Sequence, residues 1–510
     1  MDYWELAQGK KDILQFSTLF TARCVQHRLA TGDGIDGAIR WCRETAVTKV
    51  YLESFRSGHL VERELLLRAK ERFLAAGFEV AGCVTTTGVG KISTGWKITC
   101  CFTDNATLDR LESIFAYTAS MFDAIMIDDF LFTECKCEEC RRAKGSQTWA
   151  SHRCEQMSRL SRERIIKPAK NANPNAKVII KYPQWYDGFH LRGYDVVRET
   201  EDFDQIWVGT ESRDPDSRKW GRKAQYESYF IMRWLREIGG AKTGGGWFDS
   251  IGTSPPVFVE QARQTILGGA RELFLFAYGG FFRHKGPDCI ERLRDELPEL
   301  YRLAALVKGK ALSGVSAVKP PNSSPGKEKY IFDYLGMLGL PLEPAAAINF
   351  HAPSCFFSYH ALAAPDFKDL LSRMIKGGKP VLITDGLAAR LRKMQLNAPN
   401  AIILPVQGDP RSIMDLPPDA LSRIRAPLLE PFGISLDAPS RVSFYLFGED
   451  LMVFENFNDY EAEIKLSGPG YMTARAELAV PKETAVTVKT ESPGLKLNLP
   501  ARALAVFRKV

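Results

Sequence analysis

Acidic residues follow several short apolar runs in the N-terminal part of this 510-residue chain. Asp128 and Asp129 end the run DAIMIDDF, Glu211 follows DQIWVGT, and Asp249 follows GGGWF. Hydrolysis of a glycosidic bond needs two carboxyl groups, because one protonates the leaving oxygen while the other stabilises or attacks the anomeric carbon. These positions therefore predict a carbohydrate-cleaving site.

The adjacent pair Asp128 and Asp129 is the strongest catalytic candidate. Neighbouring side chains of a strand point to opposite faces, so one aspartate can face the site while the other pairs with an outer group. We expect Asp129 to be catalytic and Asp128 to orient it. Glycines before Asp249 allow the backbone to approach a substrate closely, which favours a functional role there. Glu211 is equally suited to catalysis and to an ion pair with an arginine.

Further polar and aromatic residues near these positions are candidates for substrate binding. Aromatic rings can stack on the C–H face of a sugar, and a lysine is rarely buried without a partner. The chain has only seven histidines and no G-x-S-x-G motif, which argues against histidine- or serine-based hydrolysis. The substrate-binding candidates are Arg23, Glu53, Lys181, Tyr182, Trp185, Trp247 and Tyr278.

Three cysteines lie close together in the segment TECKCEECRRAKG, at Cys135, Cys137 and Cys140. Three thiolates in such a tight loop favour tetrahedral Zn²⁺, which needs a fourth ligand. Cys101 is the expected fourth ligand, and Cys100 and Cys154 are alternatives. A site closed by four cysteines leaves no open position, so the expected zinc ion is structural. The odd total of eleven cysteines argues against a disulfide framework.

The elements that would position these residues alternate regularly. Eight short β-rich runs, each followed by an amphipathic helical pattern, fill residues 1–308 and match a (β/α)₈ barrel in count and length. Such a barrel has its active site at the carboxyl ends of its strands, where the candidate carboxylates fall. A doubly wound sheet is the weaker alternative. The runs begin at Asp12, Lys49, Phe78, Asp123, Lys177, Asp204, Gly244 and Glu272.

The rest of the chain predicts two smaller domains. Residues 309–328 are rich in Pro, Gly and Ser, which indicates a boundary. An α/β pattern then resumes, with strands expected at AAAINF, CFFSYHAL, PVLITDG and AIILPV. From about Arg441 short alternating strands follow without helices, which is typical of a small all-β domain.

The composition is that of an ordinary globular protein, with 45% apolar and 25% charged residues. The net charge of +7 is small for this length and no Lys/Arg block occurs, so no nucleic-acid partner is expected. No apolar run approaches the roughly 20 residues of a membrane helix, so no membrane partner is expected. The N-terminus MDYWELAQGKKDILQF carries charges where a signal peptide is apolar, which predicts a cytoplasmic protein.

The order of these parts resembles glycoside hydrolase family 42, the multidomain β-galactosidases. The resemblance rests on the C-x-C-x₂-C loop, on Cys101-Phe102-Thr103, on the segment FFSYHALAAPDFKDLLSRMIKGGKPVLITDG, and on the C-terminal β domain. It implies a catalytic barrel over residues 1–308, a flavodoxin-like trimerisation domain over 309–432 and a small β-sandwich domain over 433–510. A homotrimer and a zinc ion held by Cys101, Cys135, Cys137 and Cys140 are also implied.

The chain departs from this family at the catalytic carboxylates. The family has Asn-Glu after the fourth strand, with the Glu as acid/base, and a Glu nucleophile after the seventh. Here Asp128-Asp129 and Asp249 stand in those places. Aspartate is one methylene shorter, so its carboxyl group retreats by about one bond length. The resemblance implies Asp129 as acid/base and Asp249 as nucleophile, without implying β-galactosidase specificity.

The leading prediction is an exo-acting, retaining glycoside hydrolase that removes a terminal galactose-like or related sugar from an oligosaccharide or glycoside. In a second assignment, found in barrels that cleave many α-glycosides, Asp129 is the nucleophile and Glu211 the acid/base. A third hypothesis is a non-catalytic carbohydrate-binding protein on a hydrolase scaffold, which the missing glutamates suggest.

Overall fold

The computed structural model describes residues 2–221, 223–394, 396–468, 474–482, 484–491 and 494–509. The chain divides into two compact units. The first comprises residues 1–211 and 238–297, and the second comprises residues 212–237 and 298–510.

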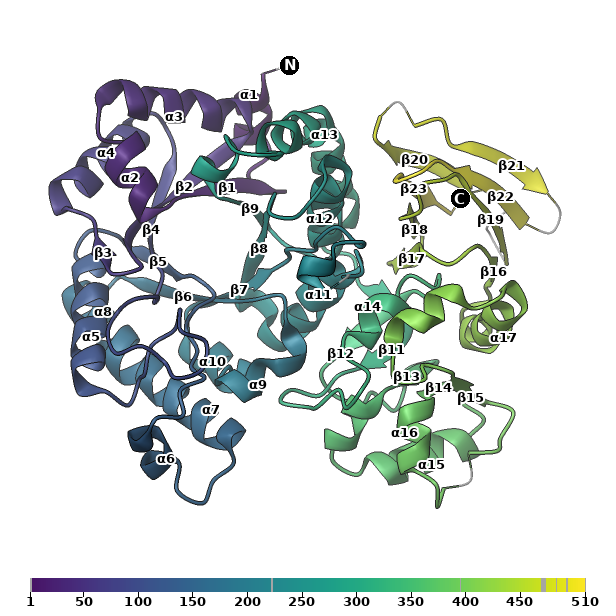
Figure 1. Ribbon diagram of the computed structural model, residues 1–510. Coiled ribbons are helices and arrows are strands. Elements are labelled where there is room, and N and C mark those ends of the chain that lie inside the picture. Colours follow the sequence, from purple (N-terminus) through teal and green to yellow (C-terminus); the bar gives the residue numbers. More distant parts are fainter. Residues whose placement is uncertain are drawn as a thin grey trace. The chain divides into compact units, whose positions relative to one another are not determined.

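Eight parallel strands of the first unit close into a barrel (Figure 1). Seven pairings follow the chain order of the strands, and the pairing of β1 with β9 completes the ring. A short strand, β3 (His59–Leu60), pairs antiparallel with the end of β2. All eight expected runs form the strands, so the predicted (β/α)₈ barrel is confirmed. The strands are β1 (Gln15–Phe20), β2 (Val47–Arg56), β4 (Glu79–Val84), β5 (Ala124–Ile127), β6 (Lys177–Tyr182), β7 (Gln205–Gly209), β8 (Thr243–Asp249) and β9 (Glu272–Phe276).

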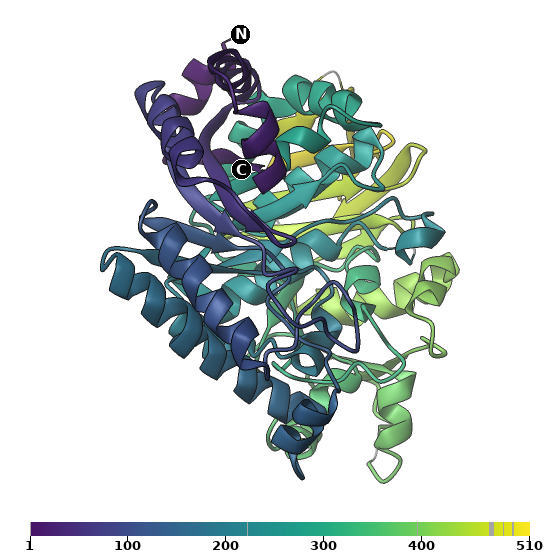
Figure 2. The same ribbon diagram turned by 60° about the vertical axis from the view of Figure 1, so that its left-hand side comes forward.

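Helices alternate with these strands along the chain, and those of the first unit lie outside the ring (Figure 2). A π-helical turn over Ser161–Ile166 joins α7 to α8. The helices are α1 (Tyr3–Gln8), α2 (Ala22–Arg28), α3 (Gly32–Glu44), α4 (Arg63–Ala75), α5 (Asn105–Ala119), α6 (Glu138–Lys144), α7 (Trp149–Leu160), α8 (Lys167–Ala172), α9 (Phe189–Arg192), α10 (Val196–Asp202), α11 (Glu227–Gly239), α12 (Pro255–Leu267) and α13 (Gly286–Val307).

The side chains that point into the barrel change from apolar to polar toward the carboxyl ends of the strands. Tyr51 and Ile179 belong to the buried apolar cluster inside the ring. Glu53 and Lys181 stand two positions further along the same strands and therefore share the inward face. An apolar interior thus ends in polar residues at the carboxyl ends of the strands.

Helix α11 follows β7, yet most of it belongs to the second unit. Phe230 stacks on Phe332 with ring centroids 4.4 Å apart, and Trp234 Nε1 donates a 2.8 Å hydrogen bond to the carbonyl of Lys319. These contacts explain the grouping, whereas the sequence predicts one domain over residues 1–308.

The second unit contains a five-stranded parallel sheet in the order β12-β11-β13-β14-β15. The predicted strand at AAAINF is misplaced, because the strand ends at Ala345 and the chain then turns, with Asn349 Oδ1 accepting a bond from the amide of His351 at 2.9 Å. The strands are β11 (Val315–Val318), β12 (Leu342–Ala345), β13 (Cys355–Phe357), β14 (Val381–Thr384) and β15 (Ala401–Leu404), and the helices are α14 (Ile331–Leu335), α15 (Phe367–Lys376), α16 (Asp385–Arg390) and α17 (Pro418–Leu429).

Two antiparallel sheets complete the second unit, in the orders β10-β17-β18-β23-β20 and β16-β19-β22-β21. The predicted fold class, a barrel followed by an α/β domain and a small all-β domain, is confirmed. The strands are β10 (Leu312–Ser313), β16 (Ser435–Asp437), β17 (Val442–Phe447), β18 (Leu451–Asn456), β19 (Ala462–Ser467), β20 (Arg475–Val480), β21 (Thr487–Glu491), β22 (Gly494–Leu499) and β23 (Leu504–Arg508).

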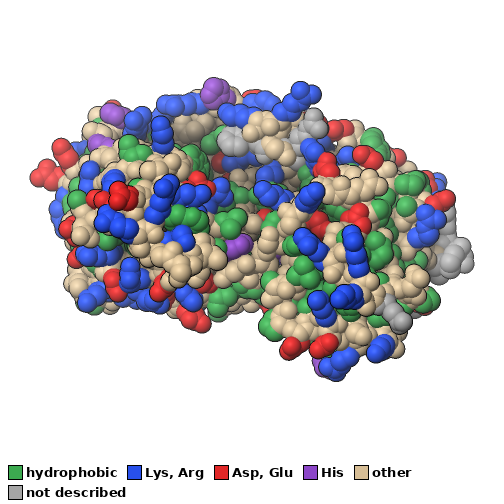
Figure 3. All heavy atoms as spheres, turned by 60° about the horizontal axis from the view of Figure 1, so that its bottom comes forward, with side chains coloured by type: hydrophobic (Ala, Val, Ile, Leu, Met, Phe, Trp, Pro, Cys, Tyr) green, Lys and Arg blue, Asp and Glu red, His purple; other side chains and the backbone are tan. Residues whose placement is uncertain are grey.

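Basic and acidic side chains are mixed on the face of the protein that Figure 3 shows. Figure 3 shows Lys and Arg scattered over one face with Asp and Glu among them. Within the described part of the chain, none of the helices has an apolar stretch long enough to span a bilayer.

Candidate active site

Asp128 lies just beyond β5 and is fixed by several hydrogen bonds. Its Oδ2 accepts bonds from Arg56 Nη2 at 2.6 Å and from Thr85 Oγ1 at 3.1 Å, and its Oδ1 accepts the amide of Asp129 at 2.7 Å. Burial alone would raise the pKa of Asp128, but the charges of Arg56 and Lys181 and these bonds hold it below its usual value. These contacts favour the ionised form of Asp128.

Asp129 is more accessible and more weakly paired. Its side chain is 19% exposed, and its Oδ2 accepts one bond from Lys181 Nζ at 3.0 Å. Burial raises the pKa of Asp129 to about 8, with help from the charges of Asp128 and Glu211 and against the opposing charge of Lys181. The environment of Asp129 thus favours its protonated form, whereas that of Asp128 favours the ionised form.

Lys181 links two of the candidate carboxylates. Its ammonium group donates to Asp129 and also to Glu211 Oε1 at 2.7 Å, and it lies 4.6 Å from the ring centroid of Trp247. The side chain is only 1% exposed. Burial lowers the pKa of Lys181, but the surrounding carboxylates together raise it by more, so the net shift is upward and the amine stays charged.

Trp247 forms an apolar floor beneath these charges. Its ring stacks on Phe274 at 4.2 Å and on Phe276 at 4.9 Å. Trp247 itself is 1% exposed, so its ring serves mainly to support Lys181 and to keep water from below the site.

Asp249 ends β8 on the same face as Trp247. Its Oδ1 accepts the amide of Ile251 at 2.7 Å, and the side chain is buried. The preceding glycines make room for protein rather than for a ligand. A Cβ on Gly244 would lie 2.3 Å from Trp207 Nε1, and one on Gly246 would lie 2.2 Å from Thr265 Cγ2. Packing thus accounts for the glycines that the sequence links to substrate approach.

Glu53 lies at the inner end of the site and is fully engaged by protein groups. It accepts bonds from Arg56 Nε at 2.8 Å, from the hydroxyl of Thr85 at 2.6 Å and from the amide of Ala22 at 2.7 Å. Burial raises the pKa of Glu53 against the pull of Arg56. Its contacts make it a support for Arg56, and through Arg56 for Asp128.

The other four substrate-binding candidates lie in different surroundings. Tyr182 follows Lys181 and points to the outer face of the barrel, where it packs on Phe189 and Tyr194. Tyr278 packs among Phe20, Trp41 and Phe282. Arg23 is exposed on α2. Trp185 is half-buried and contacts Phe132 and Tyr194.

Three residues join the site without having been assigned a role from the sequence. Arg56 and Thr85 hold Asp128, and the hydroxyl of Tyr194 donates to the carbonyl of Asp129 at 2.9 Å. Arg56 ends a strand and stands three residues after Glu53, which is a local signal for an ion pair. Tyr194 lies far along the chain in an irregular segment, where no sequence pattern points to it.

The four predicted cysteine ligands come together between the segments that follow β4 and β5. The sulfur atoms of Cys101, Cys135, Cys137 and Cys140 all lie within 4.8 Å of one another, and three of the separations are 3.5, 3.6 and 3.7 Å. Tetrahedral zinc with Zn–S bonds of about 2.3 Å would place its sulfur ligands about 3.8 Å apart. The donor set therefore fits zinc.

The two alternative ligands lie elsewhere. Cys100 Sγ is 3.7 Å from the carbonyl of Thr86, and Cys154 Sγ is 3.6 Å from the carbonyl of His190. The arrangement thus selects Cys101 from the three cysteines that the sequence left open.

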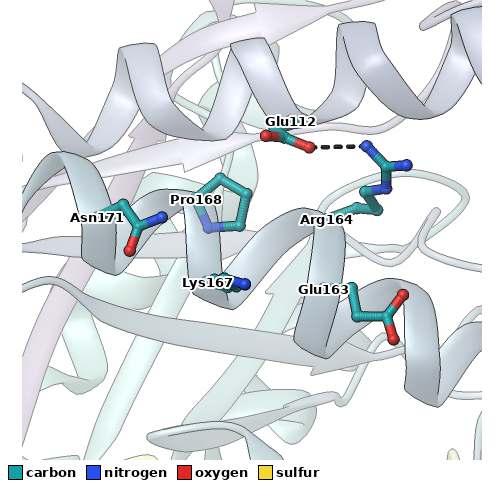
Figure 4. Close-up of a pocket in the computed structure, with 6 residues that line it drawn as sticks. All are labelled: Glu112, Glu163, Arg164, Lys167, Pro168 and Asn171. Atoms are coloured by element: carbon teal, nitrogen blue, oxygen red, sulfur yellow. Dashed lines mark hydrogen bonds and ion pairs between the residues drawn. The ribbon is translucent and has the colours of Figure 1, made fainter.

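A separate groove of about 300 Å³ lies on the outside of the barrel, lined by α5, the π-helical turn and α8 (Figure 4). Arg164 Nη1 pairs there with Glu112 Oε2 at 2.9 Å. The lining contains none of the candidate catalytic residues.

A barrel with several carboxylates at the carboxyl ends of its strands is the arrangement of a glycoside hydrolase. Residues 4–320 match the family described as probable glycosyl hydrolase, catalytic domain, and the chain belongs to this family. Membership of glycoside hydrolase family 42 stays a prediction.

Several known proteins are similar to this chain. An uncharacterized protein of Saccharolobus solfataricus is 27% identical over 341 residues, which cover 60% of this chain and 56% of that relative. The chain thus matches little more than half of the relative's length. Alpha-L-fucosidase isoenzyme 2 from Paenibacillus thiaminolyticus is 10% identical with a TM-score of 0.64, over 97% of this chain and 99% of the fucosidase. This likeness shows that the two proteins share a fold.

Proposed function

We propose that this protein is an exo-acting, retaining glycoside hydrolase in which Asp129 takes part directly in bond cleavage. The proposal rests on one carboxyl group that is accessible, lies beside a buried ammonium group and has a pKa raised to about 8. The other candidate carboxylates, Asp128, Glu211, Glu53 and Asp249, are all at most 5% exposed. A general acid must be protonated at the working pH and must reach the substrate, and Asp129 meets both requirements.

In the first assignment Asp129 is the acid/base and Asp249 the nucleophile. Asp129 gives its proton to the leaving oxygen while the Asp249 carboxylate bonds to the anomeric carbon and the glycosidic bond breaks. Water then attacks that carbon and gives a proton to Asp129, the bond between the carbon and Asp249 breaks, and the sugar leaves with its original configuration. Asp128, held by Arg56, stays ionised and helps to keep the proton on Asp129.

A second assignment makes Asp129 the nucleophile and Glu211 the acid/base. Lys181 favours it, because one ammonium group that bonds both carboxylates keeps them close together, as the spacing of about 5–5.5 Å in retaining enzymes requires. The raised pKa of Asp129 favours the first assignment, since a nucleophile should be ionised.

A screen of nitrophenyl α- and β-glycosides tests the proposal. The panel includes fucosides and mannosides as well as galactosides, with Asp129→Asn, Asp249→Asn and Glu211→Gln as variants. Sodium azide then separates the assignments. A variant without its acid/base still forms the glycosyl-enzyme, so azide yields a glycosyl azide of retained configuration. A variant without its nucleophile yields the inverted azide. Binding of oligosaccharides without any turnover would refute hydrolysis and support the carbohydrate-binding hypothesis.

We also propose a structural zinc ion at the four cysteines, where it would tie together the segments after β4 and β5. The homotrimer is a proposal that rests on the family 42 resemblance, and sedimentation of the full chain tests it.

A further inference from the structure

Four aromatic side chains form a continuous layer beside Asp129, which we call the aromatic platform: Trp96, Phe130, Phe132 and Trp185. The Trp96 ring centroid lies 5.8 Å from that of Phe130 and 5.7 Å from that of Phe132, and the Phe132 centroid lies 5.3 Å from that of Trp185. Trp96 is 46% exposed and Phe130 is half-buried, whereas Phe132 is buried beneath them. The platform therefore presents aromatic surface to solvent.

The segment that carries Trp96 is held in place at several points. The carbonyl of Lys91 accepts the amide of Cys101 at 2.7 Å, and Ser93 and Thr99 are joined by a 3.0 Å backbone bond. Thr94 Oγ1 accepts the amide of Lys136 at 2.7 Å, which fastens the segment to the cysteine loop. An exposed tryptophan on a fastened segment offers a preformed surface, and such a surface binds a ligand with little cost in ordering.

The platform is joined directly to the proposed acid. Phe130 is the next residue after Asp129, and the Tyr194 hydroxyl bonds the carbonyl of Asp129 at 2.9 Å. The Tyr194 ring packs against Phe132 at 5.9 Å and against Trp185 at 5.7 Å. The Arg192 guanidinium lies 4.4 Å from the Trp185 ring centroid and bonds Glu134 Oε1 at 2.6 Å. The acid and the aromatic rings thus belong to one packed layer.

This adjacency indicates which part of a substrate the platform would meet. A general acid lies next to the oxygen that leaves, so the group beyond the broken bond lies on the acid's side of the site. The C–H face of a pyranose ring is apolar and stacks on an aromatic ring, most favourably on tryptophan.

We propose that the aromatic platform binds the leaving group of the substrate as a second pyranose ring stacked on Trp96. The inference rests on the proposed function and deepens it, because it makes the substrate an oligosaccharide rather than a simple glycoside. Trp96 is thereby a specificity-determining residue outside the catalytic network.

The test compares two substrates with the same terminal sugar, the one that the nitrophenyl screen identifies. The first is the glycosyl fluoride, whose leaving group has no ring, and the second is a disaccharide that carries this sugar on glucose. Trp96→Ala should lower kcat/KM for the disaccharide about five- to tenfold more than for the fluoride, mainly through KM. The matched control is Ile98→Ala, since Ile98 is 41% exposed on the same segment but outside the platform. In this variant the ratio of kcat/KM for the disaccharide to kcat/KM for the fluoride should equal that of the wild type.

The outcomes separate the two proposals. Equal effects of Trp96→Ala on both substrates, or an equal change of the ratio in Ile98→Ala, would overturn the platform while leaving the hydrolase in place. A wild-type protein that turns over neither fluoride nor disaccharide would refute the hydrolase itself. A Trp96→Ala protein with a smaller sedimenting mass would show that the platform is an interface between copies of the chain, which also overturns the inference.

Discussion

The proton on Asp129 makes the pH dependence of hydrolysis predictable. With a pKa of about 8, the carboxyl group is protonated in roughly nine of ten molecules at pH 7 and in roughly one of ten at pH 9. If this proton goes to the leaving group, kcat/KM for a nitrophenyl glycoside should be level between pH 6 and 7. It should fall about tenfold per pH unit above pH 8. Initial rates at low substrate concentration measure this directly in the free enzyme.

The fall of kcat/KM above pH 8 is the alkaline limb of the pH profile. Charges of opposite sign near Asp129 should move this limb in opposite directions. The charge of Glu211 raises the pKa of Asp129, so Glu211→Gln should move the limb to lower pH. Lys181 lowers that pKa, so Lys181→Met should move the limb to higher pH. Because both changes leave a buried group without its ion pair, thermal unfolding of each variant must first show a folded protein.

Asp129→Asn supplies the decisive comparison. We expect a loss of roughly 10²- to 10⁴-fold on substrates with poor leaving groups, a smaller loss on dinitrophenyl glycosides, and no alkaline limb in what activity remains. Two results would refute the assignment of Asp129 as the acid. One is a wild-type kcat/KM that already falls with rising pH below pH 6, and the other is an unchanged alkaline fall in Asp129→Asn. Loss of activity on every leaving group together with an inverted azide product would assign Asp129 as the nucleophile.

Three further predictions concern the stability of the protein and of its site. Removal of zinc with a chelator, or Cys137→Ser, should lower the melting temperature, and elemental analysis should find one zinc ion per chain; protein with no bound metal after purification with zinc would contradict this. Arg263 and Glu296 form a buried pair at 2.7 Å between α12 and α13, and Arg292 also contacts Glu296 at 2.8 Å, so Arg263→Met should lower the free energy of unfolding in urea by about 3 kcal/mol, the lower end of the range for a broken buried pair. Arg411→Ala, which removes the exposed pair with Asp409, should cost less than about 1 kcal/mol, and equal losses would contradict the role of burial. Tyr194→Phe removes the bond to the Asp129 carbonyl, which should lower the free energy of unfolding by about 0.5–1.5 kcal/mol and also lower the activity on the screened glycoside. If neither the free energy of unfolding nor the activity changed, the positioning role of Tyr194 would be contradicted.

The barrel could be predicted from the sequence because its signals are local. Each strand is a short apolar run followed by a helical pattern, and the carboxyl ends of the strands share one side of the barrel whatever the packing details. Alternation along β6 also assigns Lys181 and Tyr182 to opposite faces, which means that only one of them can face the mouth. The structure places Lys181 inward and Tyr182 among outer aromatic rings.

The partners of these residues could not be predicted, since they come from distant segments. Asp128 and Asp129 lie beyond the end of β5, where strand alternation no longer applies, and both reach cations from other strands. Tyr194 contributes its hydroxyl from an irregular segment after α9. Similarly, the choice of Cys101 over its neighbour Cys100 depends on where the segment after β4 turns.

If Asp129 is the acid, as proposed, the charges at the mouth account for an aspartate where the resembling family has glutamate. Four carboxylates, those of Glu53, Asp128, Asp129 and Glu211, share the two cations Arg56 and Lys181. A buried group of this kind lowers its excess negative charge by binding protons, and the pKa is raised at Glu53 and Asp129 but lowered at Asp128. Glu53 is enclosed by Arg56, Thr85 and the amide of Ala22, whereas the side chain of Asp129 is 19% exposed, so Asp129 is the one of the two that a substrate can reach. In the proposed mechanism the acid is thus selected by its place in the charge network, and side-chain length affects only how close the glycosidic oxygen must come.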